Sequence, residues 1–259
     1  MSPAFTIRRR LLALAACLAV STLALPALGQ QPQSYAVLSL AVDKLTMVAP
    51  QMTTGSHIDR NLRQIVDLPD DSMDIATVQA AELAIKQLQP GAAVELFSTR
   101  SAKAYAAAGM DEATEDTAAL MAALKPFFSN TQAPYFVLIT KHREDAKLQF
   151  HKAMHGIGKL AGAGFYVDEH QDQRIVDANT GENLSGFFAP YASLRFRLIE
   201  IAGQKVIRDT TAQASKVHAG SLSAPSAWNS MSPEDKTKLL QRMINQTVSE
   251  GVGKLLAQP

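Results

Sequence analysis

The hydrophobic and polar positions of the chain fall into unbroken apolar runs, stripes with helical spacing and alternating stretches. One run, Tyr135–Thr140, consists of β-branched, aromatic and leucine residues and follows Pro134 directly. It is too short for a buried helix, and its composition favours a strand that is covered on both faces. We therefore expect Pro134–Arg143 to lie in the middle of a sheet, between other layers.

A helical pattern precedes this strand. It predicts a helix from about Met73 to Gln89, with Ser72 or Asp74 accepting a free backbone amide at its start and Pro90-Gly91 ending it. Its apolar positions recur at three- and four-residue steps and form one packing stripe: Ile75, Val78, Ala81, Ile85 and Leu88.

A second helix is predicted to end near Phe127-Phe128. The small-residue segment 102–109 before it fits either a helix or a linker. Acidic residues are favourable near the positive end of a helix dipole, and four of them open this helix: Asp111, Glu112, Glu115 and Asp116. Its packing face is Leu120, Met121, Leu124, Phe127 and Phe128.

The last helix begins at Ser232-Pro233-Glu234-Asp235, which supplies a hydroxyl cap, a proline where no amide is needed and acids in the first turn. Its polar face includes Glu250 and few lysines, so we expect it to dock on its own sheet rather than on a membrane or a partner. Its apolar side is Leu240, Met243, Ile244, Thr247, Val248, Gly251, Val252 and Leu255.

The remaining segments predict strands. We expect a hairpin of Tyr35–Val42 with Leu45–Val48, and short strands at Gln64–Leu68, Val94–Leu96 and Gly164–Asp168. After the central strand, we expect 146–151 to return antiparallel through the corner at 143–145. Arg195 and Arg197 alternate with apolar residues, which predicts a strand with one wet face, and Gly203 turns it into a hairpin with 205–211.

These elements predict an α/β (α+β-like) fold: a single-domain sandwich of a mixed, mainly antiparallel sheet with helices packed on it, including the C-terminal amphipathic helix. The domain is expected to occupy residues 30–259 and to follow a signal peptide at 1–29. Arg8, Arg9 and Arg10, the apolar stretch Leu11–Leu25 and the small residues Ala27 and Gly29 have the three-part pattern of an export signal. The apolar stretch is short for a membrane span, and we expect no transmembrane span in the mature chain.

Cys17, the only cysteine, lies in this segment. The string Leu14-Ala15-Ala16-Cys17 resembles a bacterial lipoprotein box, so an acylated Cys17 is the alternative to cleavage after Gly29. Cleavage leaves no cysteine, which excludes disulfides and cysteine-based sites. It also removes three of the 25 basic residues and leaves 22 against 24 acidic ones. This balance does not indicate nucleic acid, whose binders carry a basic face.

We find no convergent chemistry and predict no cofactor, metal or catalytic set. His151 and His155 are four residues apart, but Lys152 stands where a zinc protease of the HExxH type needs its glutamate. The G-x-G-x-x-A match at 156–161 is followed by a predicted strand rather than the helix of a dinucleotide site, so it indicates a turn. His142 and His170 lie near carboxylates, which leaves a hydrolase or small-molecule-binding enzyme as an alternative.

Aromatic residues near loops offer either a partner surface or closure of the sheet end, and closure is the favoured interpretation. The candidate interaction surface is Lys141, His142, Arg143, Phe187, Phe188, Tyr191 and Trp228.

Several segments resemble an uncharacterised family of exported proteins from Gram-negative bacteria: Ala36–Val48, Ile139–Arg143, Gly164–Asp168, Phe187–Tyr191 and Trp228–Lys236. The order of elements is also similar to the α/β module of outer-membrane lipoproteins that activate penicillin-binding proteins or build curli-secretion pores. The first resemblance implies export without an assigned activity.

Together these patterns predict a non-catalytic periplasmic or cell-envelope accessory or binding protein that contacts another envelope protein. A lipid-tethered structural subunit of the envelope, attached through Cys17, is the third possibility.

Overall fold

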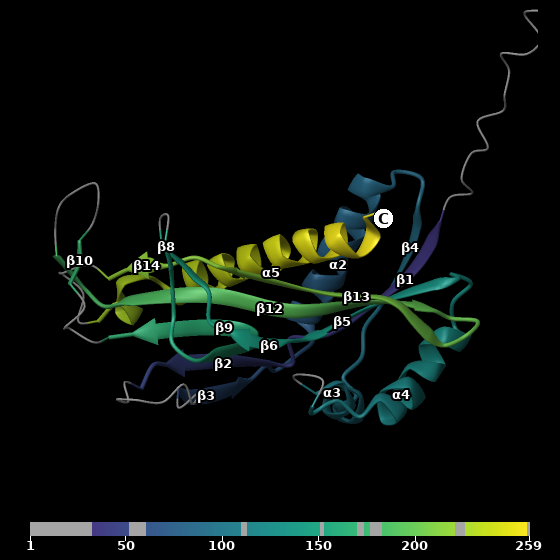
Figure 1. Ribbon diagram of the computed structural model, residues 1–259, viewed down its shortest axis with the longest axis horizontal. Coiled ribbons are helices and arrows are strands. Elements are labelled where there is room, and N and C mark those ends of the chain that lie inside the picture. Colours follow the sequence, from purple (N-terminus) through teal and green to yellow (C-terminus); the bar gives the residue numbers. More distant parts are fainter. Residues whose placement is uncertain are drawn as a thin grey trace, which may run out of the picture. The chain divides into compact units, whose positions relative to one another are not determined.

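The structure is a computed structural model that describes residues 33–51, 61–109, 113–150, 153–169, 174–176, 183–220 and 226–257. The predicted signal peptide and Cys17 lie outside these residues. From Ser34 onward the described chain forms one compact unit, a mixed ten-stranded sheet with α-helices on both faces (Figure 1). None of the helices in the described part has the length and apolar character needed to cross a bilayer.

The sheet is organised around one long strand, β12 (Phe187–Glu200). Along one edge, its first half pairs with β9 (Lys159–Asp168) and its second half with β5 (Tyr135–Lys141). Its other edge pairs with β14 (His218–Ala219) and β13 (Lys205–Ser215). The β12–β13 pair is the hairpin that the sequence predicts, and the sheet therefore divides into two branches at β12.

The first branch confirms the central position of β5. β1 (Ser34–Leu40) pairs in parallel with β5 on one side and with β4 (Ala93–Phe97) on the other, so β5 lies between β12 and β1. Val137 and Ile139 belong to the core on one face of the sheet, and Phe136 and Leu138 to the core on the opposite face. The apolar run is buried because both of its faces are covered.

The second branch shows that the predicted hairpin is wrong. β2 (Lys44–Ala49) runs parallel to β9 and pairs antiparallel with β3 (Leu62–Asp67), while β1 lies in the other branch. The chain leaves β1 where the amides of Ala41 and Val42 donate to the carboxylate of Asp74. Asp74 is more than thirty residues away in sequence, so the local pattern contained no sign of this contact.

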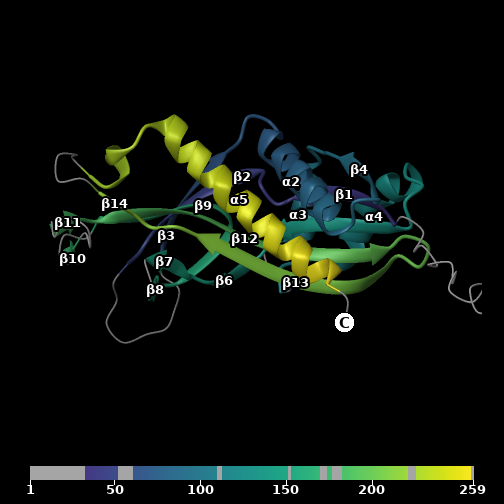
Figure 2. The same ribbon diagram turned by 90° about the horizontal axis from the view of Figure 1, so that it is seen from above.

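Two helices cover each face of the first branch and of β12. α2 (Ser72–Leu88) and α5 (Pro233–Leu256) lie side by side on one face, as Figure 2 shows. α3 (Ala102–Ala108) and α4 (Thr117–Ser129) pack on the other (Figure 1). The segment 102–109, for which the sequence fits either a helix or a linker, is thus largely helical.

α2 is confirmed as a helix, but its predicted stripe is only partly correct. Val78, Ala81 and Ile85 are buried, whereas Ile75 and Leu88 are exposed. The predicted cap is wrong as well, because Asp71 holds the cap position without a side-chain hydrogen bond. Asp74 points into the core instead, where it accepts hydrogen bonds from the amides of Ala41 and Val42.

α5 is confirmed in its start and in its buried face. The hydroxyl of Ser232 accepts a hydrogen bond of 3.1 Å from the amide of Asp235, and Pro233 is the first helical residue. All eight predicted apolar positions are buried. Gly251 lies against the ring of Phe196 on β12, which leaves no room there for a side chain.

α4 begins after Asp116, whose carboxylate accepts a hydrogen bond of 2.9 Å from the amide of Ala119. Of its predicted packing face, Leu120, Leu124 and Phe128 are buried, while the other two positions are partly buried against the same core. Asp111 and Glu112 lie outside the described residues.

The chain after β5 differs from its prediction. β6 (Arg143–Asp145) is itself a strand and pairs with β9, and β7 (Leu148–Phe150) pairs with β8 (Ala153–His155) instead of returning onto β5. Gly156 and Gly158 have positive φ angles between β8 and β9, so the G-x-G segment is a turn that leads into a strand, as predicted. A separate pair consists of β10 (Arg174–Val176) and β11 (Asn183–Ser185), and η1 (Trp228–Ser230) is a short 3-10 helix.

Candidate functional site

The predicted basic segment lies where β5 leads into β6. The Lys141 ammonium pairs with the carboxylate of Asp43, and both side chains are largely buried. The backbone amide of His142 donates to the carbonyl of Ser193 over 3.0 Å. Arg143 is half-buried and stands opposite Ala161 in the β6–β9 ladder. The segment therefore joins the two branches of the sheet, and its role in binding a partner stays a prediction.

The predicted aromatic residues lie mostly in the core. Phe187, Phe188 and Tyr191 are buried, as closure of the sheet end requires, and their part in an interaction surface stays a prediction. Trp228 is half-buried, with its ring edge-on to that of Phe188 at 5.9 Å between centroids. The ammonium of Lys236 lies 3.8 Å from the centroid of the Trp228 ring, a cation–π contact. These positions follow from the burial of both faces of β12.

Of the histidines that the sequence singles out, only His142 has a described side chain. Among the described residues, no group of three or more His, Cys, Asp and Glu side chains is placed to hold a metal ion. His170 and the side chains of His151 and His155 lie outside the described part. Asp168 is buried at the end of β9.

A buried carboxylate joins three elements instead. Asp74, at the start of α2, is 3% exposed and accepts hydrogen bonds from the hydroxyls of Ser39 and Tyr105 and from two amides that follow β1. Burial and the nearby Asp74 carboxylate raise the pKa of Tyr105, so its hydroxyl stays protonated and donates. This arrangement fixes β1, α2 and α3 to one another.

A second polar cluster lies beneath the α3–α4 connection. Arg197 is 2% exposed, and its guanidinium donates to both carboxylate oxygens of Glu115 at 2.7 Å. Arg195, two residues earlier on the same face, donates from Nε to Asp209 Oδ1 at 2.9 Å. Burial lowers the pKa of the Arg197 guanidinium, and the carboxylate of Glu115 opposes that effect. The predicted wet face of β12 is therefore wrong, because Glu115 covers it.

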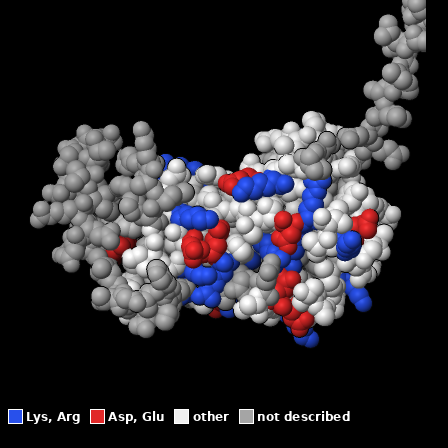
Figure 3. Space-filling model, in the orientation of Figure 1, with Lys and Arg blue, Asp and Glu red and all other residues white. Residues whose placement is uncertain are grey.

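Charged side chains on the surface are mixed in sign. On the face seen in Figure 3, basic and acidic groups adjoin one another over the described part. Exposed pairs include Lys44 with Asp67 at 3.1 Å and Lys254 with Glu250 at 2.7 Å. Pairs of this kind contribute little stability, but they neutralise the surface on which they lie.

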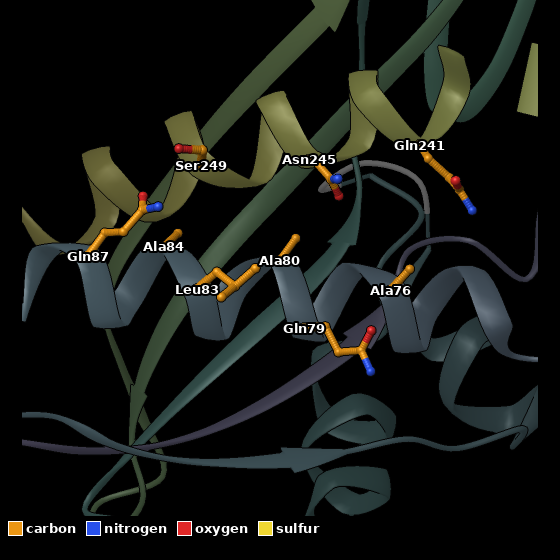
Figure 4. Close-up of a pocket in the computed structure, with 9 residues that line it drawn as sticks. All are labelled: Ala76, Gln79, Ala80, Leu83, Ala84, Gln87, Gln241, Asn245 and Ser249. Atoms are coloured by element: carbon orange, nitrogen blue, oxygen red, sulfur yellow. The ribbon is translucent and has the colours of Figure 1, made fainter. Parts of the chain in front are cut away.

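A groove between α2 and α5 is the candidate functional site. It has a volume of about 370 Å³ and lies on the outer side of the two helices, away from the sheet (Figure 4). Leu83 rises from α2 into it and is 63% exposed. The lining residues are Ala76, Gln79, Ala80, Leu83, Ala84 and Gln87 of α2 with Gln241, Asn245 and Ser249 of α5.

The chemistry of the groove is uniform. Its lining consists of alanines, one leucine, one serine and side-chain amides, and none of these nine side chains is ionisable. Amides both donate and accept hydrogen bonds, whereas the alanines allow another backbone to approach closely. The groove thus offers contact area and neutral hydrogen bonds.

The sequence contains a signal for this site that the prediction missed. Gln241, Asn245 and Ser249 recur every four residues, as do Ala76, Ala80 and Ala84, so each set forms one stripe along its helix. Neither stripe contains a charged residue. In the prediction, the polar face of the last helix serves only to judge its charge.

The sequence matches no known family of proteins and no curated protein. Among solved structures, the chain is similar to a DUF330 protein from Xanthomonas campestris, at 12% identity and a TM-score of 0.38 over 88% of each chain. It is also similar to the PelC dodecamer from Paraburkholderia phytofirmans, at 10% identity and a TM-score of 0.32 over 90% of this chain and 94% of that one. A lipoprotein from Neisseria meningitidis gives 10% identity and a TM-score of 0.29 over 83% and 97%. Similarity at this level carries no conclusion about what this chain does.

Proposed function

We propose that the protein is a non-catalytic, exported accessory protein of the bacterial cell envelope, and that it binds a helical segment of another envelope protein in the α2–α5 groove. The observation that carries the proposal is the lining of the groove, which has small and neutral polar side chains and no ionisable group. Such a lining supports recognition rather than proton transfer, for which a titratable group is needed.

The spacing of the lining residues favours a helix as the occupant. Residues four apart form the ridges and grooves along which helices pack, at axis separations of roughly 8–10 Å. Ala76, Ala80 and Ala84 provide a shallow wall of this kind, and Gln241 and Asn245 provide the other. The partner helix would carry an apolar stripe with uncharged polar residues beside it, because a charge buried among alanines would lose its hydration.

The location rests on the amino-terminal pattern. Arg8–Arg10, the following apolar stretch and the small residues before position 30 are typical of an export signal. Mass spectrometry of the mature amino terminus separates the two forms that the sequence allows. A free Gln30 supports a soluble periplasmic protein, and a diacylated Cys17 supports a tethered one.

Two exposed leucines on α2 provide a matched test of the groove. Leu83 lines it, whereas Leu88 does not, and they are 63% and 52% exposed. A photo-crosslinking amino acid at position 83 should capture one defined segment with helical apolar spacing, and the same probe at position 88 should not. A synthetic peptide of that segment should then bind the purified protein and gain helicity in circular dichroism.

Lysine substitutions complete the test. Leu83→Lys should lower the affinity for the peptide at least about tenfold, because burying a leucine contributes roughly 1.5–3 kcal/mol. Leu88→Lys should leave the affinity unchanged, and its comparable exposure controls for the added charge. Equal capture at both positions, or peptide binding that is insensitive to Leu83→Lys, would overturn the proposal.

A further inference from the structure

The outermost strand of the second branch, β3, is exposed on both of its faces. All six of its residues are exposed, including Leu62 at 61%, Ile65 at 60% and Val66 at 42%. One edge pairs with β2, and within the described part of the chain no strand pairs with the other edge. The strand thus carries apolar side chains next to a row of backbone groups that can accept another strand.

Protein sheets usually protect such an edge with proline, a bulge, inward-pointing charges or a covering helix. β3 contains no proline or glycine, and its ladder with β2 runs through six consecutive pairs without a bulge. The helices pack over the other branch and over β12 and β13, away from β3 (Figure 1). As far as the described residues show, the edge is therefore open to strand addition.

The order of side chains on β3 is complementary to itself. Arg63, Ile65 and Asp67 alternate along the strand, so they share one face of the sheet. In an antiparallel pair of two copies centred on Ile65, Arg63 stands opposite Asp67 of the partner subunit, and the same contact occurs a second time by symmetry. Centring the pair on Gln64 or Val66 instead places an apolar residue opposite a charged one.

We propose that β3 pairs with β3 of a second copy of this chain, antiparallel about Ile65, and joins the two sheets into one across a symmetric dimer. The pairing covers Ile65 with its own symmetry mate and adds a backbone ladder to the open edge. Asp67 is available for it, because its carboxylate is 80% exposed beside Lys44. Arg63 donates to the carbonyls of Lys159 at 3.0 Å and Asn61 at 3.3 Å within its own subunit, and in the dimer it would turn from them to Asp67 of the partner subunit. The dimer surface is separate from the α2–α5 groove and goes beyond the function proposed above.

Charge exchange tests the register. Arg63→Asp and Asp67→Arg each place like charges opposite one another twice in the dimer, and either should weaken dimerisation at least about tenfold in sedimentation equilibrium. The double variant Arg63→Asp/Asp67→Arg should restore it. Contacts within one subunit, such as Arg63 with Lys159, are not restored by the exchange, so recovery separates the dimer from a folding defect. A double variant that dimerises as weakly as the single variants would overturn the proposal.

Cysteine crosslinking provides an independent measurement. In a Cys17→Ser background, an introduced cysteine is the only one in the chain. Ile65→Cys should give a covalent dimer with a short bismaleimide, because position 65 faces its own symmetry mate. Ile207→Cys, on β13 and 42% exposed, is the matched control and should not. A monomer at all concentrations, or equal crosslinking at the two positions, would overturn the proposal.

Discussion

Replacing Gly251 by alanine should destabilise the protein, whereas the same substitution at Gly253, two residues further along α5, should stabilise it. A Cβ atom at position 251 would lie 2.1 Å from Cε2 and 2.4 Å from Cδ2 of the Phe196 ring. A Cβ atom at position 253 would meet nothing within 4 Å. The two glycines therefore share a helix and differ in the space around them.

The expected magnitudes follow from this geometry. Alanine is more favourable than glycine inside a helix by about 0.8–1 kcal/mol, and Gly253 should yield most of that gain. At Gly251 the same gain is opposed by overpacking, which costs roughly 1–3 kcal/mol. Carbon atoms in contact lie about 3.5–4 Å apart, so α5 or the ring must move by about 1 Å or more. Phe196 is fully buried and cannot turn into solvent. A clash this short puts the overpacking in the upper half of its range, so we expect a net loss of about 1–2 kcal/mol.

Urea unfolding followed by far-UV circular dichroism measures both variants against the parent protein. A second control removes the obstructing ring. In a Phe196→Leu background, Gly251→Ala should cost at least about 1 kcal/mol less than in the parent, since residues in contact are not additive. A Gly251→Ala protein as stable as the parent, or an unchanged cost without the ring, would refute the packing described for α5.

Two further predictions concern buried polar groups. Glu115→Gln should cost about 3 kcal/mol or more in urea unfolding, because it leaves the buried Arg197 guanidinium without its carboxylate. The matched change Glu82→Gln, in the more exposed pair with Lys86, should cost less than about 0.5 kcal/mol. Equal losses in the two variants would contradict the expectation that the buried ion pair contributes more. Burial raises the pKa of Tyr166 to about 12, above the ordinary value near 10. Its contribution to stability is complete below pH 10 and is lost towards pH 12, at up to about 1.4 kcal/mol per pH unit. Tyr166→Phe should reduce that alkaline slope, and an unchanged slope would count against this burial.

Sequence patterns predicted the elements whose structure depends on residues close to one another in the chain. Tyr135–Thr140 consists of β-branched, aromatic and leucine residues, and the structure covers it on both faces in mid-sheet. Ser232 and Pro233 define the start of α5 with local chemistry alone, and its buried face follows from helical spacing. These features depend on contacts within a few residues of the chain.

The predictions that are wrong concern contacts between segments distant in the sequence. The predicted hairpin fails because Asp74 binds the amides after β1, and the predicted wet face of β12 fails because Glu115 covers Arg197. In both cases a charged residue that looked like a helix-start acid serves a partner far away. The groove shows the same limit, because two uncharged stripes form a site only once α2 and α5 lie side by side.

The position of β12 in the chain has a consequence for how the protein folds. β5 and β9 both pair with it, yet β12 begins only at Phe187. A chain that emerges from its amino terminus first holds the strands of both branches before the strand that joins them is available. Pairings between distant segments form slowly, and unpaired strands aggregate. We therefore expect the two branches to join only after the last third of the chain has emerged.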